Sequence, residues 1–311
     1  MHVGTQGFSP RTRSDAQLIR FGNDAGRVAL RGERGGSQLE VEVTLRVGEG
    51  KRAKLNGAPL RAAEQLRTEV ATLVFTPDRL AVAKGGPAVR RAYFDRVHGR
   101  LAPARATLPV DYAAALAQRN AALRRVAGGF SSRDALEPWT EQVATLGREL
   151  VEARIETLSL LAPLFAERGE ELGLGAARLA YSGEPPTKVG LEERLQRDLD
   201  RGSTGLGPHR DDVVLLSGTR DLRTFGSQGE QRLTVLALLL AEAEVIAERR
   251  GLRPLLLLDD VLSELDPARR RILAGRVAGE GQTLIAATEA TALPVEPAQL
   301  LAVSPGEVRA A

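Results

Sequence analysis

The stretch Leu255-Leu256-Leu257-Leu258-Asp259-Asp260 decides the fold class of this chain. Four consecutive apolar residues are typical of a strand that is buried on both faces of a sheet, with helices packed against it. A helix is expected over 228–250 before this strand, and a helix over 267–278 and a strand over 283–287 after it. Strand, helix and strand in this order predict an α/β unit.

The two carboxylates at the end of the run predict a ligand site. Ligands of open α/β sheets bind beyond the carboxyl ends of the strands, which is where Asp259 and Asp260 follow the apolar run. One carboxylate suits Mg²⁺, directly or through water, and the other can orient an attacking water. Asp266 then has the position of a helix cap, with Pro267 as the first helical residue. This Walker B pattern is unspecific by itself, because apolar runs that end in acidic residues are common.

A second candidate site precedes the strand, at the start of the expected helix. Ser227 and Glu230 have the spacing of a capping box, with Gln228 and Gly229 between them. Gly229 near a helix N-terminus exposes backbone N–H groups to an anion. The alternative interpretation is an ordinary helix start without a ligand.

The rest of the chain predicts a sheet-forming segment followed by a helical insertion. Residues 39–47 alternate between apolar and polar, as a half-exposed antiparallel strand does, and Asn56-Gly57 predicts a hairpin turn. A short buried strand is expected over 71–75. From residue 87 to about 201 the apolar spacing is helical, which predicts an arm of antiparallel helices. We therefore divide the chain into 1–86, 87–203 and 204–311, the first and last forming one α/β head.

Composition excludes several classes of protein. The 311 residues contain no cysteine and three histidines, so disulfides, thiolate metal sites and multi-histidine metal sites are not expected. No apolar run approaches the roughly 18 residues of a membrane span, and the N-terminus lacks the apolar core of a signal peptide, so a cytoplasmic protein is expected. The net charge of +3, with only four lysines among 43 basic residues, supports nucleic-acid binding weakly, because an arginine-rich genome gives the same composition.

Several segments resemble the RecF family of DNA-repair proteins. The segment 207–212 reads Gly-Pro-His-Arg-Asp-Asp and resembles the GPHRDD segment of that family, and residues 257–273 fit its Walker B signature. A further family signature is similar to the segment 77–95 at Pro77-Asp78, Gly85-Gly86-Pro87, Arg90-Arg91, Tyr93 and Asp95, with departures at Ala83 and Phe94. Three segments resemble, in chain order, the motifs of ABC and SMC ATPase heads: the signature motif at 227–232, the Walker B strand at 255–260 and the D-loop at 263–267.

The resemblance implies a fold, a function and partners. The fold is an α/β head of the ABC/SMC type, with mixed sheets, flanking helices and an inserted helical arm. The function is that of an ATP-dependent homodimer that binds duplex DNA and gapped or single-stranded DNA, and that acts with RecO and RecR to load RecA. Another SMC-like head is disfavoured, because such proteins carry far longer coiled coils. A nucleotide-free scaffold that binds DNA or protein remains an alternative.

The resemblance also implies roles for individual residues. Asp259 would hold Mg²⁺ and Asp260 would orient the attacking water. ABC heads usually have Glu at the position of Asp260, so slow hydrolysis is expected. Thr288 stands at the position of the switch histidine of those heads. The expected contacts to ATP bound by the partner protomer are Ser227, Gln228, Gly229, Glu230 and Asp266, and the expected DNA contacts are Lys84, Arg90 and Arg91. For Arg90 and Arg91 the alternative is a solvated surface.

The phosphate-binding loop of this family does not occur in the sequence. None of the four lysines follows the Gly-x-x-x-x-Gly pattern that such a loop requires. A start codon assigned too far downstream, or a truncated gene, would remove it, whereas a nucleotide-free descendant would lack it altogether. Whether this chain is an ATPase therefore stays open, and the reading frame upstream of Met1 separates the two explanations.

Overall fold

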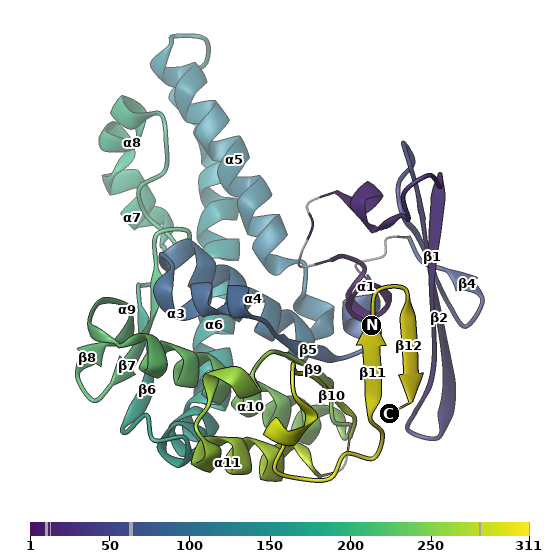
Figure 1. The fold of residues 1–311 in the computed structure, drawn as a ribbon. Helices are drawn as coiled ribbons and strands as arrows, with labels where there is room; N and C mark the ends of the chain where they lie inside the picture. Colours follow the sequence, from purple (N-terminus) through teal and green to yellow (C-terminus); the bar gives the residue numbers. More distant parts are fainter. Residues whose placement is uncertain (10–11, 13, 62–64, 280, 311) are drawn as a thin grey trace. The chain divides into compact units, whose positions relative to one another are not determined.

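The computed structural model describes residues 1–311 except 10–11, 13, 62–64, 280 and 311 (Figure 1). The chain forms two compact units, and each has its own secondary structure. Unit 1 consists of residues 1–79 and 246–311, and unit 2 of residues 80–245.

Unit 1 contains an antiparallel sheet built from the first part of the chain. Its strands lie in the order β1-β2-β3-β4, and β2 is the predicted alternating strand, with Val41, Val43 and Leu45 buried. Asn56 and Gly57 both have positive φ and join β3 to β4, which confirms the predicted hairpin. The strands are β1 (Ala25–Arg34), β2 (Ser37–Arg46), β3 (Arg52–Leu55) and β4 (Ala58–Pro59), and the short helices beside them are α1 (His2–Gln6), a 3-10 turn (Asp15–Leu18) and α2 (Leu66–Glu69).

Unit 1 also contains the predicted parallel sheet, in the order β10-β9-β5. The central strand β9 (Leu255–Asp259) pairs with β5 (Thr72–Phe75) on one side and with β10 (Thr283–Ala286) on the other. The predicted strand–helix–strand unit is therefore confirmed. It is completed by α11 (Pro267–Val277) and by 3-10 turns at Leu262–Glu264, Pro77–Leu80 and Ala290–Ala292, and a hairpin of β11 (Leu301–Ser304) and β12 (Glu307–Ala310) follows.

Unit 2 contains the helical arm. The two long helices α5 (Leu108–Ala127) and α6 (Glu137–Glu171) pack against each other around an apolar cluster that includes Val143 and Leu150. Arg119 is fully buried in this hairpin, where its guanidinium contacts Asp198 and Thr204. The other helices are α3 (Ala81–Lys84), α4 (Pro87–Leu101), α7 (Lys188–Glu193), α8 (Leu195–Arg201), α9 (Leu222–Phe225) and α10 (Gln228–Arg250), with 3-10 turns at Pro103–Arg105 and Arg133–Leu136.

A small antiparallel sheet in unit 2 interrupts the stretch that was expected to be helical. Its order is β6-β7-β8, with β6 (Ala177–Ser182) paired along its whole length with β7 (Asp212–Ser217), and with β8 (Arg220–Asp221) at the edge. The strand β6 was missed because its partner lies about 35 residues further along the chain, and a short run without clear periodicity does not reveal such pairing.

The predicted domain limits at 86/87 and 203/204 differ from the limits of the two units. The pairing of β7 with β6 places residues 212–217 in unit 2, and the signature helix α10 lies in this unit up to Val245. Among the described residues, no helix is both long enough and apolar enough to cross a membrane.

Candidate functional site

The Asp259–Asp260 pair lies where the central strand of the parallel sheet ends. Asp259 is the last residue of β9 and stands opposite Ala286 of β10. The Asp260 N–H donates to the Ala286 carbonyl at 3.0 Å, and Asp260 itself has φ 54. Asp and Asn are the residues other than Gly that adopt this left-handed conformation most readily. The chain therefore turns sharply at Asp260 and leaves this side chain exposed at the sheet edge.

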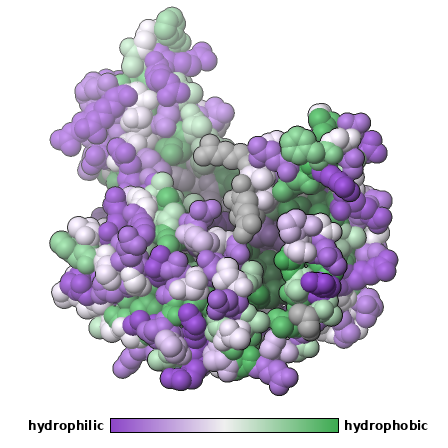
Figure 2. All heavy atoms as spheres, in the orientation of Figure 1, coloured by the Kyte–Doolittle hydropathy of each residue, from purple (hydrophilic) through white to green (hydrophobic). Residues whose placement is uncertain are grey.

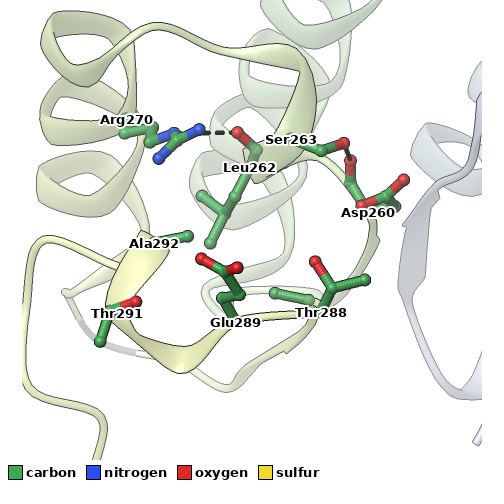
Figure 3. Close-up of a pocket in the computed structure, with 9 residues that line it drawn as sticks. Asp260, Leu262, Ser263, Arg270, Thr288, Glu289, Thr291 and Ala292 are labelled. Carbon is green, nitrogen blue, oxygen red and sulfur yellow. Dashed lines mark hydrogen bonds between the residues drawn. The ribbon is translucent and has the colours of Figure 1, made fainter.

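A pocket of about 290 Å³ opens beside Asp260 (Figure 3). It is formed by the segment after β9, by the segment after β10 and by the first turns of α11. Asp260 and Thr288 both line it, so the predicted catalytic carboxylate and the predicted switch position meet in one cavity. Arg270 closes one side, because its Nε donates to the Leu262 and Leu265 carbonyls at 2.9 Å.

Glu289 is a pocket residue that sequence reasoning did not assign to the site. Figure 3 shows its carboxylate pointing into the pocket between Leu262 and Ala292. The only signal in the sequence is its position directly after Thr288, because residues that follow parallel strands gather at one edge of the sheet.

Asp266 caps helix α11, as predicted. One carboxylate oxygen accepts the backbone N–H of Arg269 at 2.9 Å, and the other accepts a guanidinium hydrogen bond from the same residue at 2.8 Å. The backbone hydrogen bond from Arg269 favours the charged form and lowers the pKa of Asp266. The role of Asp266 at a dimer interface stays a prediction.

The signature helix α10 begins with the predicted capping box. The Ser227 N–H donates to Glu230 Oε2 at 2.8 Å, and the Glu230 N–H donates to Ser227 Oγ at 3.2 Å. The hydrogen bond from the Ser227 N–H lowers the pKa of Glu230, and Arg220 at 2.7 Å adds to this effect. Gln228 and Gly229 are exposed at the same turn. The capping is confirmed, whereas a contact with a nucleotide phosphate stays a prediction.

A buried polar cluster fixes the side of α10 that faces the interior of unit 2. Glu242 is fully buried, and Arg100 Nε donates to its Oε1 at 2.6 Å. Tyr93 donates its hydroxyl hydrogen to the other carboxylate oxygen at 3.0 Å. Both partners belong to α4, so this short helix holds the signature helix through a charged pair.

The same helix α4 holds the segment 207–212 through Arg90. The Arg90 side chain is 3% exposed, and it binds both carboxylate oxygens of Asp212, at 2.8 and 2.6 Å. Its third hydrogen bond goes to the Gly85 carbonyl at 2.7 Å. A guanidinium in this position cannot reach a DNA phosphate, so the prediction that Arg90 contacts DNA does not hold. The sequence could not reveal that Arg90 is buried, because the carboxylate that pairs with it, Asp212, lies 122 residues further along the chain.

Asp211 and His209 are fixed by tyrosine side chains. Tyr181 donates to Asp211 Oδ2 at 2.6 Å, and burial raises the pKa of that carboxyl. His209 Nε2 faces the Thr204 carbonyl at 3.0 Å and must donate to it, so Nδ1 accepts from the Tyr112 hydroxyl at 2.7 Å. Burial lowers the pKa of His209, which favours this neutral form.

The long arm helix is joined to the segment 207–212 as well. Arg154 of α6 forms two hydrogen bonds with Asp95 of α4, at 2.8 and 2.9 Å, and a third with the Pro208 carbonyl at 2.7 Å. One set of buried ion pairs thus connects α4, α6 and β7.

Three basic residues surround this buried set, and their side chains remain accessible to different degrees. Lys84 and Arg210 are exposed, and neither has an ion pair among the residues that the structure describes. Arg91 is half-buried and donates to the Asp211 carbonyl at 2.6 Å. The sequence places Arg210 in the GPHRDD segment without indicating a binding role for its side chain. The exposure of Arg210 could not be predicted, because it depends on the hydrogen bonds that its neighbours His209, Asp211 and Asp212 make within the protein.

Comparison with known proteins places the chain. No family model matches it. It is 35% identical to the DNA replication and repair protein RecF of Heliobacterium modesticaldum over 280 residues, which cover 86% of this chain and 75% of that protein. It is 34% identical to the RecF of Bacillus mycoides over 308 residues, covering 93% of this chain and 81% of the relative.

The chain belongs to the RecF family. Solved structures agree with this assignment. A recombination mediator protein RecF with ATP superposes with a TM-score of 0.87 and 25% identity, covering all of this chain and 86% of that one. The head of an Smc protein from Pyrococcus yayanosii superposes with a TM-score of 0.54 at 14% identity and shows the fold alone. The predicted fold, an ATPase head of the ABC/SMC type with an inserted helical arm, is confirmed.

Within the RecF family, the GPHRDD segment has a structural role in this chain. Its residues Gly207, Pro208, His209, Asp211 and Asp212 all take part in the contacts that join α4, α6 and β7 or hold the turn between them. Only the side chain of Arg210 points away from these contacts into solvent.

Proposed function

We propose that this chain is a recombination mediator of DNA replication and repair, which binds DNA in an ATP-dependent manner near single-strand gaps and helps RecO and RecR to load RecA. The observation that carries the proposal is the identity of 33–35% with RecF proteins over most of the chain. Those relatives are DNA replication and repair proteins by name, and the structural neighbour with ATP is a recombination mediator of the RecFOR pathway.

The nucleotide-binding part of the proposal rests on two sets of residues. Ser227, Gln228, Gly229 and Glu230 open a helix of 23 residues. The capping box uses the N–H groups of Ser227 and Glu230, and those of Gln228 and Gly229 would face an anion. In unit 1, Asp260 and Thr288 line the pocket at the end of the parallel sheet, beside Asp259. ATP would supply the phosphates that link two protomers, with Ser227, Gly229 and Asp266 of one protomer facing the nucleotide of the other.

Mg²⁺ fits the site only if the protein and the nucleotide bind the ion together. No group of three or more His, Cys, Asp or Glu side chains suited to a metal occurs in the described part of the chain. Asp259 would therefore contribute one carboxylate, and phosphate and water oxygens would complete the six-fold shell that Mg²⁺ prefers. Asp260 would orient water.

The DNA contacts that we propose are Lys84, Arg91 and Arg210. They lie around the buried Arg90–Asp212 pair, which is too enclosed to bind a ligand itself. Contacts of this kind go to phosphate oxygens and carry no sequence information. Each of them would release counterions from the DNA, so that affinity falls steeply as the salt concentration rises.

Fluorescence anisotropy with a labelled, gapped duplex tests this assignment. We expect Arg210→Gln to weaken binding and to reduce the slope of log K against log salt by about one. Arg178→Gln is the matched control, because Arg178 is an exposed arginine of the same unit on strand β6. An unchanged affinity and salt slope in Arg210→Gln would remove this residue from the DNA site. A wild-type chain that binds no DNA even at low salt would refute the function.

A second candidate function is a nucleotide-free scaffold. It differs from the first in needing no Gly-x-x-x-x-Gly-Lys-Ser/Thr loop, and no such loop occurs within these 311 residues. The test begins with the reading frame upstream of Met1, which is searched for this loop. If the loop is found, the protein that includes it is sedimented with and without ATP. We expect an ATP-dependent dimer that Ser227→Arg abolishes. A dimer that forms without nucleotide, or that survives Ser227→Arg, would favour the scaffold.

A further inference from the structure

The turn between α5 and α6 presents an exposed aromatic ring on a fixed backbone. The Gly128 N–H donates to the Arg124 carbonyl at 3.0 Å, and the Phe130 N–H donates to the Arg125 carbonyl at 2.8 Å. Gly129 has φ 75, a conformation that favours glycine. A Cβ on Gly128 would lie 2.9 Å from the Phe130 ring, so the ring rests over this glycine. The Phe130 side chain is nevertheless 80% exposed.

Phe130 does not belong to the apolar cluster that joins the elements flanking the turn. Leu123, Leu136 and Leu199 are buried together and join α5, the 3-10 turn before α6, and α8. Beneath them lies the buried Arg119–Asp198 ion pair, with its N–O distance of 2.8 Å. The base of the turn is therefore firmly held, and the ring is presented to solvent by a stable support.

The exposed residues on the segments that form and flank this turn include several arginines. Arg124 and Arg133 are exposed, and each makes one hydrogen bond, to the Gly202 carbonyl at 3.3 Å and to the Gln196 side chain at 3.1 Å. Arg125 and Arg201 are exposed without any ion pair among the described residues. Figure 2 shows apolar atoms at the free end of the arm, next to a strongly hydrophilic flank. We name this set the arm tip: Arg124, Arg125, Phe130, Arg133 and Arg201.

We propose that the arm tip binds single-stranded nucleic acid, with Phe130 stacked on an unpaired base and the arginines on the adjoining phosphates; this rests on the proposed DNA function. Aromatic rings next to cationic side chains are the combination that binds single strands without sequence preference. In a duplex the base faces are already stacked, so an aromatic ring on a turn has no face to pair with. A protein partner would be expected to meet a wider apolar surface, whereas the residues exposed on the same elements as Phe130 include four arginines.

The test measures the affinity of the intact chain for a labelled oligo(dT) and for a blunt duplex of equal length. Phe130→Ala is expected to weaken oligo(dT) binding about tenfold and to leave duplex binding unchanged, whereas Phe130→Tyr retains both. Arg125→Gln is expected to lower the salt slope for the single strand by about 0.7. Val110→Ala is the matched control, because Val110 is a 69% exposed apolar residue of α5 outside the tip.

A fluorescent ring provides direct evidence. Trp139 is the only tryptophan, so the double substitution Phe130→Trp/Trp139→Phe places the sole indole at the tip. Quenching by oligo(dT) and not by the duplex supports the proposal. Unchanged oligo(dT) affinity in Phe130→Ala overturns it, and a simultaneous loss of RecR binding would assign the tip to a protein partner. If the wild-type chain binds neither DNA, the proposed DNA function fails. If it binds both and Phe130→Ala changes neither affinity, only the arm-tip proposal fails.

Discussion

The buried pair between Glu242 and Arg100 predicts a large effect of a small substitution. Glu242→Gln removes the charge and keeps the shape, so Arg100 remains buried without a counter-ion. Removing one partner of a buried pair typically costs about 3–5 kcal/mol. Because glutamine still offers one oxygen to Arg100 or Tyr93, we expect the lower end, about 3 kcal/mol. With a urea dependence of about 2 kcal/mol per molar, the unfolding midpoint should fall by about 1.5 M.

Trp139 makes this prediction measurable, because the only tryptophan of the chain lies on α6 in the same unit as Glu242. Urea unfolding is therefore followed by tryptophan fluorescence. The double variant Glu242→Leu/Arg100→Met should recover most of the loss, since apolar residues of similar volume often replace a buried ion pair at little cost. A shift below about 0.5 M for Glu242→Gln, or a double variant no more stable than the single one, would refute the reasoning.

Three further outcomes are expected. Gly207→Ala should destabilise the chain by more than about 2 kcal/mol in urea unfolding, because Gly207 has φ 127 and a Cβ there would lie 2.6 Å from the Tyr112 hydroxyl. The pKa of Glu230 is lowered in the folded chain, so its contribution to stability is complete above its ordinary pKa of 4.5 and is lost as the pH falls through the lower folded value. Glu230→Gln should therefore lose less stability between pH 7 and pH 3.5 than the wild type does. Arg119→Met should cost about 3–5 kcal/mol, and Arg119→Met/Asp198→Leu clearly less, as unfolding curves of both variants would show.

The sequence predicted elements whose signal is local. Helix α10 begins and ends at the expected residues, since a capping box precedes it and its apolar spacing is regular. The strand β9 is recognisable from its own apolar run, and the meeting of Asp260 with Thr288 follows from the geometry of parallel strands. These features need no knowledge of distant residues.

Features that depend on distant partners could not be predicted. Arg90 reads as a surface cation until Asp212 is brought against it, and the same holds for Arg100 and Glu242, 142 residues apart. The exposure of Arg210 and of Phe130 is equally invisible, because it depends on which neighbours the fold has already used. A basic or aromatic residue in a sequence thus indicates a candidate contact. Whether its side chain is exposed to a ligand or paired inside the protein is shown only by the folded structure.

The parallel sheet of unit 1 has a consequence for synthesis of the chain on the ribosome. Strand β5 must wait for β9, its partner in the register Thr72–Leu255, while about 180 intervening residues are made. At 5–20 residues per second this interval lasts about 10–40 s. The arm, with its neighbouring contacts, can fold within that time, whereas the edges of β5 stay unpaired and open to other strands. A nascent chain halted before residue 255 should therefore expose β5 to chaperones or proteases, and one halted well beyond it should not.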